Sequence, residues 1–135
     1  MNHWLVKSEP GVYAYAALEK DRGTAWTGVR NYAARIHLSA MKVGDRLLYY
    51  HSGDDKAVVG IAEVTKVAYP DPTCPDDPRW VCVDVKPVQR LGTPVTLATI
   101  KADAVLSKSE LVRQGRLSVV PFTAAQFARV LKLGQ

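Results

Sequence analysis

Residues 69–78 contain four prolines in ten positions, and this segment limits the folds open to the chain more than any other. Proline has a fixed φ and lacks a backbone N–H, so such a run cannot lie inside a sheet. The flanking residues 57–68 and 80–89 are rich in β-branched and aromatic side chains, which favour strands. We therefore expect residues 69–78 to form a loop that connects two paired strands.

The composition is typical of one compact domain spanning residues 1–135. With 47% hydrophobic and 23% charged residues, a chain of this size buries roughly two-thirds of its unfolded surface without disulfide or metal support. Cys74 and Cys82 lack the partner residues of a disulfide framework or a zinc site. Neither a signal peptide nor an apolar run of membrane-spanning length is present. We expect a cytoplasmic monomer, with association with the nucleoid as an alternative, and no membrane partner or bound cofactor.

The remaining segments predict short strands and short helices without an internal repeat. Strands are expected over residues 3–6, 46–51, 57–68, 80–89 and 117–120. Helices are expected over residues 14–20, 31–40, 96–102 and 123–131. Asn31, Thr96 and a capping box of Thr123 and Gln126 provide N-terminal signals for three of them. Five or six strands without regular βαβ alternation indicate an α+β fold, a mixed domain around a small curved sheet or barrel.

The charge is positive and unevenly distributed along the chain. Lysine and arginine exceed aspartate and glutamate by 18 to 13, with a formal charge of +5 and a pI near 9.3. Residues 86–135 contain eight basic and two acidic groups, whereas residues 68–85 contain one and four. Such a polarised surface could follow a phosphate backbone. Ordinary solubilising charge is the alternative explanation.

Common catalytic and metal-binding motifs are absent from the sequence. None of the GxGxxG, GxxxxGK[ST], HExxH, GxSxG or paired CxxC patterns occurs. A hydrolase would have to use His51 and Ser52, but consecutive strand residues point to opposite faces, so these two side chains are a poor base and nucleophile pair. The spacing of His3, His37 and His51 matches no metal-ligand motif. The sequence therefore favours binding over catalysis.

Two short stretches combine aromatic and polar residues in a way that suits a nucleobase. Residues 4–10 place Lys7 and Ser8 between a strand and a helix, where a cation and backbone N–H groups can meet an anion. Residues 26–35 offer a flat ring, an amide and guanidinium groups, as required to hold a flipped base. The residues concerned are Trp26, Gly28, Arg30, Asn31 and Arg35. The alternative for each is structural, because a tryptophan can belong to the core, Asn31 can cap its helix, and arginines can be solvated.

Seven motifs, in order along the chain, resemble those of one known family. They are HWLVKSEP, WTGVRNYAAR, MKVGDRLLYYHS, VGIAEV, AYPDPT, DPRWVCVDV and LVRQGRLSVVP. Together they resemble the EVE domain, a module of thymocyte nuclear proteins and of many small bacterial proteins. The resemblance implies a PUA-like fold, a small β-barrel of five to six strands flanked by short helices and related to the YTH and ASCH modules. It also implies a reader of modified bases in DNA, such as 5-methylcytosine and its oxidised forms, without catalytic activity.

The resemblance assigns roles to particular residues of this chain. It implies a base pocket built from Trp26, Asn31, Ser8, Val29, Tyr50, His51 and Ser52. Beside the resemblance, we expect phosphate contacts from Lys7, Arg30 and Arg35 and from one or both of Arg113 and Arg116, with surface ion pairs as the alternative for the last two. The loop at residues 74–77 is shorter than in many members of the family, so contacts made by a longer loop are not expected here.

The resulting hypothesis is that the protein extrudes a modified nucleotide, stacks its base on Trp26 and reads the base edge with Asn31 and Ser8. This requires an opening beside the Trp26 ring that is large enough for a pyrimidine. Three alternatives stay open. They are a reader of modified tRNA or mRNA with the same pocket, a nucleotide-processing enzyme that uses His51 as a base, and a site for a small metabolite.

Overall fold

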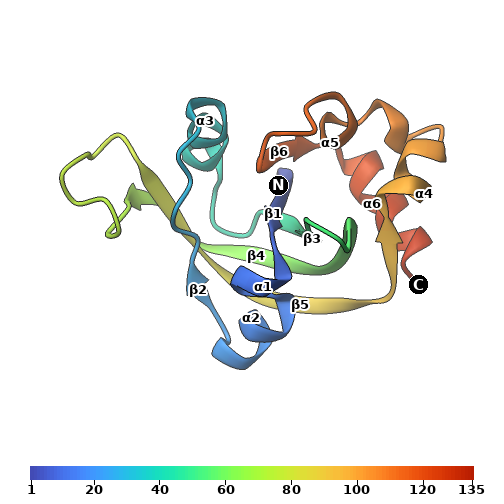
Figure 1. Ribbon diagram of the computed structural model, residues 1–135, viewed down its shortest axis with the longest axis horizontal. Coiled ribbons are helices and arrows are strands. Elements are labelled where there is room, and N and C mark those ends of the chain that lie inside the picture. Colours follow the sequence, from blue (N-terminus) through green and yellow to red (C-terminus); the bar gives the residue numbers. More distant parts are fainter.

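The structure, a computed structural model, describes residues 1–135 and is built on a six-stranded sheet (Figure 1). The strands are β1 (His3–Ser8), β2 (Thr24–Ala25), β3 (Arg46–His51), β4 (Ala57–Pro70), β5 (Val81–Thr96) and β6 (Val119–Phe122). Their order in the sheet is β2-β5-β4-β3-β1-β6, so β2 and β6 are its edges. The predicted α+β fold with a small curved sheet is confirmed, although the edges do not meet to close a barrel.

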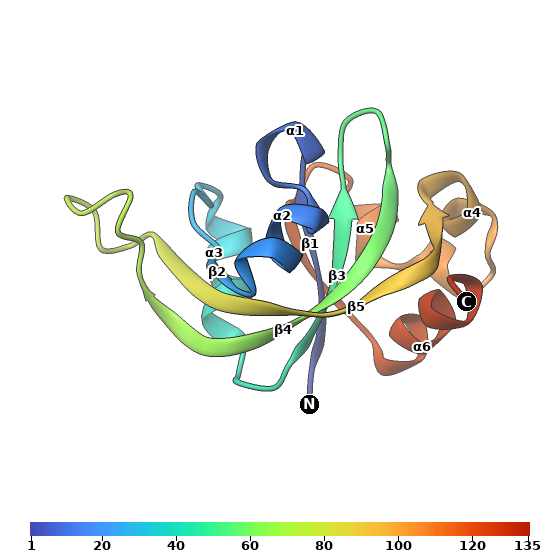
Figure 2. The same cartoon turned by 90° about the horizontal axis from the view of Figure 1, so that it is seen from below.

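The two longest strands, β4 and β5, bend together across the molecule, and their connecting loop projects from one end (Figure 2). This confirms a loop between paired strands, although Tyr69 and Pro70, predicted to lie in it, pair with Cys82 and Val81 at the end of the sheet. The β5 strand is longer than predicted, even though it contains Pro87. The register between β4 and β5 shifts next to the pair of Ala62 and Pro87. Such an irregularity accommodates a residue that cannot donate a ladder hydrogen bond.

Short helices flank the sheet. They are α1 (Pro10–Tyr13), α2 (Tyr15–Asp21), α3 (Tyr32–Ala40), α4 (Leu97–Ala102), the 3-10 helix η1 (Leu106–Lys108), α5 (Glu110–Arg113) and α6 (Ala124–Leu133). The predicted capping roles of Asn31, Thr96 and the pair of Thr123 and Gln126 are confirmed by their hydrogen bonds. None of these helices has both the length and the apolar character needed to cross a membrane.

Some predicted boundaries differ from the structure for local reasons. The helix expected over residues 14–20 is preceded by a separate turn, α1, because Ala14 has an extended backbone (φ −78°, ψ 159°) that ends α1 and precedes α2. The last strand begins later than expected, because the N–H of Leu117 bonds to the carbonyl of Gln114 in a turn. Neither η1 nor α5 was predicted from the sequence.

The core lies between the concave sheet and the helices, and one glycine is essential to its packing. The ring of Tyr15 lies against Gly60 of β4, where an added Cβ would approach the ring to 2.5 Å. The Tyr15 hydroxyl donates to the carbonyl of Ile61 at 2.7 Å. This contact fixes α2 against the sheet and with it the segment that carries α1.

Candidate functional site

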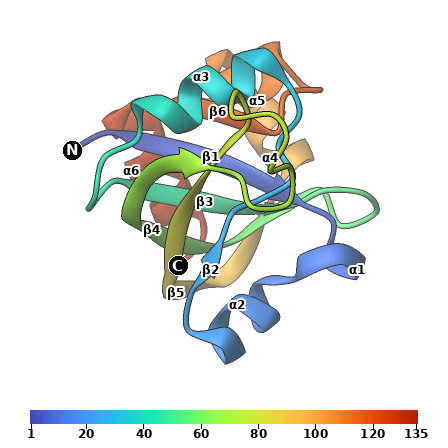
Figure 3. The same ribbon diagram turned by 90° about the vertical axis from the view of Figure 1, so that its left-hand side faces the viewer.

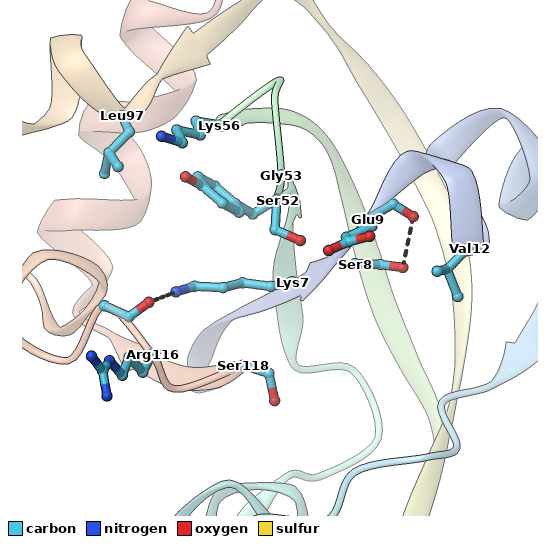
Figure 4. A pocket seen from close by; sticks show the side chains of 12 residues that line it. Lys7, Ser8, Glu9, Val12, Ser52, Gly53, Lys56, Leu97, Arg116 and Ser118 are labelled. Carbon is cyan, nitrogen blue, oxygen red and sulfur yellow. Dashed lines mark hydrogen bonds between the residues drawn. The ribbon is translucent and has the colours of Figure 1, made fainter.

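Three hollows in the surface adjoin one another near the carboxyl end of β1. The Lys7 hollow has a volume of about 530 Å³ and is lined by residues that include Lys7, Ser8, Tyr50, Ser52, Lys56 and Arg116 (Figure 4). The Trp26 hollow, of about 290 Å³, shares Ser8 and Val12 with it. The Asn31 hollow, of about 440 Å³, shares Gly115 and Arg116 with it. The three hollows therefore form one continuous surface.

The side chain of Lys7 lines the Lys7 hollow, and its ammonium group is bonded to the turn at Gly115. Its Nζ donates to the carbonyl of Gly115 at 2.7 Å and lies 5.7 Å from the centre of the Tyr50 ring. Burial lowers the pKa of Lys7 below that of an ordinary lysine. The carbonyl occupies one of three N–H donors, so an anion entering the hollow can still bind to this group.

The other polar groups of the Lys7 hollow also suit an anion. Lys56 and Arg116 add two cations, and Glu9 is the one carboxylate of the lining. Hydroxyl groups come from Ser8, Ser52 and Ser118. Excess positive charge beside neutral donors is the chemistry that binds a phosphate group.

The Trp26 ring belongs to the core but borders an opening. Trp26 is 8% exposed, and its ring meets that of Tyr49 edge to face, with centroids 5.4 Å apart. The Trp26 hollow is also lined by Ser8, Val12, Tyr13, Thr24, Ala25 and Thr27. A hollow therefore adjoins Trp26, although the residue is almost wholly buried, and stacking of a base on its ring stays a prediction.

Asn31 lies apart from Trp26. Its side-chain oxygen accepts from the N–H of Ala34 at 3.1 Å, which caps α3. Asn31 lines the Asn31 hollow together with Arg113 and Arg116, and it does not line the Trp26 hollow. The structure places the amide beside the predicted phosphate-binding arginines.

Val29 and His51 are buried and line none of the three hollows. The Nε2 atom of His51 accepts from the N–H of Tyr15 at 3.1 Å, and its Nδ1 lies 3.2 Å from a carboxylate oxygen of Asp55. Because Nε2 is an acceptor, Nδ1 carries the hydrogen and donates to Asp55. Both ring nitrogens are thus engaged, and neither is free to act as a base.

The loop between β4 and β5 lies beside the segment that leads into α3 (Figure 3), and Asp71 anchors one to the other. Its buried carboxylate accepts from the N–H of Gly28 at 2.8 Å, from Arg30 at 3.0 Å and from the Thr73 hydroxyl at 2.6 Å. Burial opposes ionisation of Asp71, but these hydrogen bonds outweigh it and lower its pKa to about 2. The charge of Arg30 is therefore already balanced within the protein.

The structure brings five of the predicted site residues to one hollow, namely Lys7, Ser8, Tyr50, Ser52 and Arg116. Sequence reasoning missed Val12 and Lys56, which line the same hollow. Both come from segments next to the quoted motifs, and only the fold brings them to the site. No three histidine, cysteine, aspartate or glutamate side chains come together as a metal-binding group.

Comparison with protein families and curated proteins gives one consistent result. The EVE domain model matches residues 2–133. Thymocyte nuclear protein 1 of Gallus gallus is 35% identical over 97% of this chain and 68% of its own length. The human protein of that name is 33% identical over 98% of this chain and 73% of its own length.

Solved structures share the fold over nearly the whole chain. A Rhodopseudomonas palustris protein determined by NMR is 48% identical with a TM-score of 0.94, covering 99% of this chain and 93% of that one. The human THYN1 protein in complex with 5-methylcytosine containing DNA is 33% identical with a TM-score of 0.93, covering 100% and 98% of the two chains. An ASCH protein from Zymomonas mobilis has a TM-score of 0.63 at 12% identity, which shows a shared fold alone.

Proposed function

The chain belongs to the EVE domain family, and we propose that it binds DNA carrying 5-methylcytosine or an oxidised derivative by holding the modified nucleotide outside the double helix. The relative in complex with 5-methylcytosine containing DNA supports this choice of ligand. The observation that carries the proposal is that the Trp26 hollow adjoins the cationic Lys7 hollow, with Ser8 and Val12 lining both. Base and phosphate of one nucleotide can occupy adjoining hollows of this kind.

The two hollows divide the recognition of one nucleotide. The base enters the Trp26 hollow, where the ring provides an apolar wall and Ser8, Thr24 and Thr27 offer hydroxyls to its polar edge. The phosphate lies in the Lys7 hollow among Lys7, Lys56 and Arg116. Asn31 contacts the backbone next to this nucleotide rather than the base, since it lines a different hollow.

The energies expected for this arrangement limit its selectivity. Contact with an aromatic side chain contributes about 1–3 kcal/mol per base. The added methyl group of 5-methylcytosine contributes only about 0.8 kcal/mol when buried, and a hydrogen bond to an oxidised group adds more. We therefore expect a preference of a few-fold for 5-methylcytosine over cytosine.

Binding rather than catalysis is supported by the state of His51. A general base needs a free nitrogen within reach of its substrate. Both nitrogens of His51 bond within the protein, to Tyr15 and Asp55, and His51 lines neither the Trp26 hollow nor the Lys7 hollow.

Trp26→Ala is expected to weaken binding of a 5-methylcytosine oligonucleotide by about tenfold to a hundredfold, because the wall of the base hollow is lost. Fluorescence anisotropy with labelled single strands and duplexes measures this change. Val12→Glu is a second variant, because Val12 is 78% exposed between the two hollows. A carboxylate there repels phosphate without disturbing the core.

Lys132→Ala is the matched control, since it removes a charge on α6, outside all three hollows. Unchanged affinity in both Trp26→Ala and Val12→Glu would show that the two hollows do not hold the nucleotide. Matched RNA strands test the other ligand class. If the RNA strands bind more tightly than the DNA strands, the ligand is RNA and not DNA, because only a site that engages the 2′-hydroxyl prefers RNA.

A further inference from the structure

We propose that Tyr32, Trp80 and Arg35 form a second nucleotide contact, which takes an unpaired nucleotide next to the extruded one. This inference rests on the proposed function and extends it from one nucleotide to a short single-stranded segment. None of these three residues lines the Trp26 hollow or the Lys7 hollow.

The aromatic part of this contact joins the start of α3 to the β4–β5 loop. The rings of Tyr32 and Trp80 have centroids 5.1 Å apart and an interplanar angle of 33°. Tyr32 is 54% exposed, although an aromatic side chain of this size usually buries most of its surface. Arg79 donates to the Tyr32 hydroxyl at 3.1 Å, which holds the ring in place. The result is a positioned aromatic pair in which Tyr32 is exposed and Trp80 is partly buried.

The arginines around this pair differ in what they can still bind. Arg30 and Arg79 are paired with Asp71 and Asp77, each at 3.0 Å or less. Arg35 makes no ion pair and no side-chain hydrogen bond, and its Nε is buried without a partner. Its guanidinium lies 5.9 Å from the centre of the Tyr32 ring. Arg35 is therefore the arginine of this cluster whose terminal guanidinium nitrogens make no hydrogen bond or ion pair within the protein.

An unpaired guanidinium beside an exposed aromatic ring fits a nucleotide. The donors of arginine match the oxygens of a phosphate in a bidentate arrangement, and an aromatic ring stacks with any base. Bases inside a duplex are stacked on each other and are not available to a side chain outside the helix. The contact is therefore specific for an unpaired base and not for duplex DNA.

The position of the cluster connects it with the proposed site. Tyr32 directly follows Asn31, which lines the Asn31 hollow with Arg113 and Arg116. That hollow shares Arg116 with the Lys7 hollow. A strand that leaves the Lys7 hollow across Arg116 and Asn31 reaches Tyr32 next.

Two ligands separate this contact from the base hollow. One is 5-methyl-2′-deoxycytidine 5′-monophosphate, which can fill only the proposed nucleotide site, and the other is a nine-nucleotide single strand with one central 5-methylcytosine. Tyr32→Ala is expected to weaken binding of the nine-nucleotide strand by roughly tenfold and to leave binding of the mononucleotide unchanged. Tyr32→Phe keeps the ring and is expected to bind like the wild type.

Arg35→Gln tests the phosphate part. We expect it to weaken binding of the strand and to reduce the slope of log K against log[salt] by about 0.7, the value for one phosphate contact on a single strand. Val67→Ala is the control for Tyr32→Ala, because it shortens another exposed apolar side chain, 49% exposed on β4.

The outcomes distinguish the two proposals. Wild-type affinity of Tyr32→Ala for the nine-nucleotide strand would overturn the second contact, whatever Trp26→Ala does. If Tyr32→Ala weakens strand binding while Trp26→Ala has no effect on either ligand, the proposed base hollow is wrong and the second contact stands. If the wild type binds neither ligand, the second contact is wrong, and if a 5-methylcytosine duplex also fails to bind, the proposed function is wrong as well.

Discussion

At the scale of single residues, Lys7 has an unusual position for a cation. Its partners are the Gly115 carbonyl and the Tyr50 ring, and neither carries a full negative charge. Burial lowers its pKa, so its proton is held less tightly than that of a solvent-exposed lysine. A phosphate in the Lys7 hollow would supply the missing negative charge.

This gives a pH dependence of binding with a definite sign. As the pH rises, Lys7 loses its charge below the ordinary lysine value of 10.5, and the affinity for phosphate should fall with it. Lys7→Arg is expected to remove this fall, because arginine stays protonated throughout. Binding of the 5-methylcytosine strand between pH 7 and 10 measures the difference between the two proteins. Lys132→Arg is the control, and an identical profile for Lys7→Arg and the wild type would show that Lys7 does not contact the ligand.

The residue types of the site could be predicted from the sequence better than their positions could. Tyr50 and Ser52 line the Lys7 hollow while His51 between them does not, in keeping with the alternation of strand residues. The separation of Asn31 from Trp26 depends on the path of the chain between them. That path is set by the long-range bond from Gly28 to Asp71, which has no local signal in the sequence.

At the scale of elements, the β4–β5 loop is held mainly through Asp71. Its carboxylate accepts hydrogen bonds from the loop itself and from the segment before α3. The Tyr32–Trp80 contact joins the same two parts of the chain. The loop is therefore part of the site's framework rather than a free excursion.

Asp71→Asn is expected to lower the free energy of unfolding by about 2 kcal/mol at neutral pH. The pKa of Asp71 is about 2, below its ordinary value of 3.8, so its stabilisation is complete above pH 3.8 and is lost as the pH falls through 2. Urea unfolding at pH 7, 4 and 2 should show the difference from the wild type shrinking at the lowest pH. Asp76→Asn, at an exposed loop position, is the control. A constant difference at all three pH values would contradict this role of Asp71.

Elements with local signals were predicted well, and those that depend on distant contacts were not. The caps of α3, α4 and α6 follow from residues within one turn of each helix. By contrast, β5 contains Pro87 and Gly92 and still continues to Thr96. It does so because it pairs with β4 up to the pair of Thr96 and Ala57. The short η1 and α5 have no periodic pattern long enough to detect.

At the scale of the whole molecule, the basic C-terminal part of the chain reaches the site through one loop. Arg113 ends α5 and pairs with Glu110 at 3.4 Å, Arg116 lies on the turn between α5 and β6, and both arginines line the Asn31 hollow. Lys7, from the other end of the chain, bonds to Gly115 within the same turn. The fold thus combines cations from both ends of the sequence along one surface, where a phosphate backbone can contact several of them.

The salt dependence of binding tests whether this surface follows a nucleic-acid backbone. With three or four phosphate contacts on a single strand, log K should fall with log[salt] at a slope of about −2 to −3. Removing Arg113 and Arg116 together, by substitution with alanine, should make this slope less steep by about 1.4, because each contact on a single strand accounts for about 0.7. Replacing Lys108 and Lys132 with alanine lowers the net charge equally but at positions outside the three hollows. An equal loss of slope in both double variants would mean that binding responds to net charge alone, whereas a loss confined to the arginine pair identifies the path of the strand.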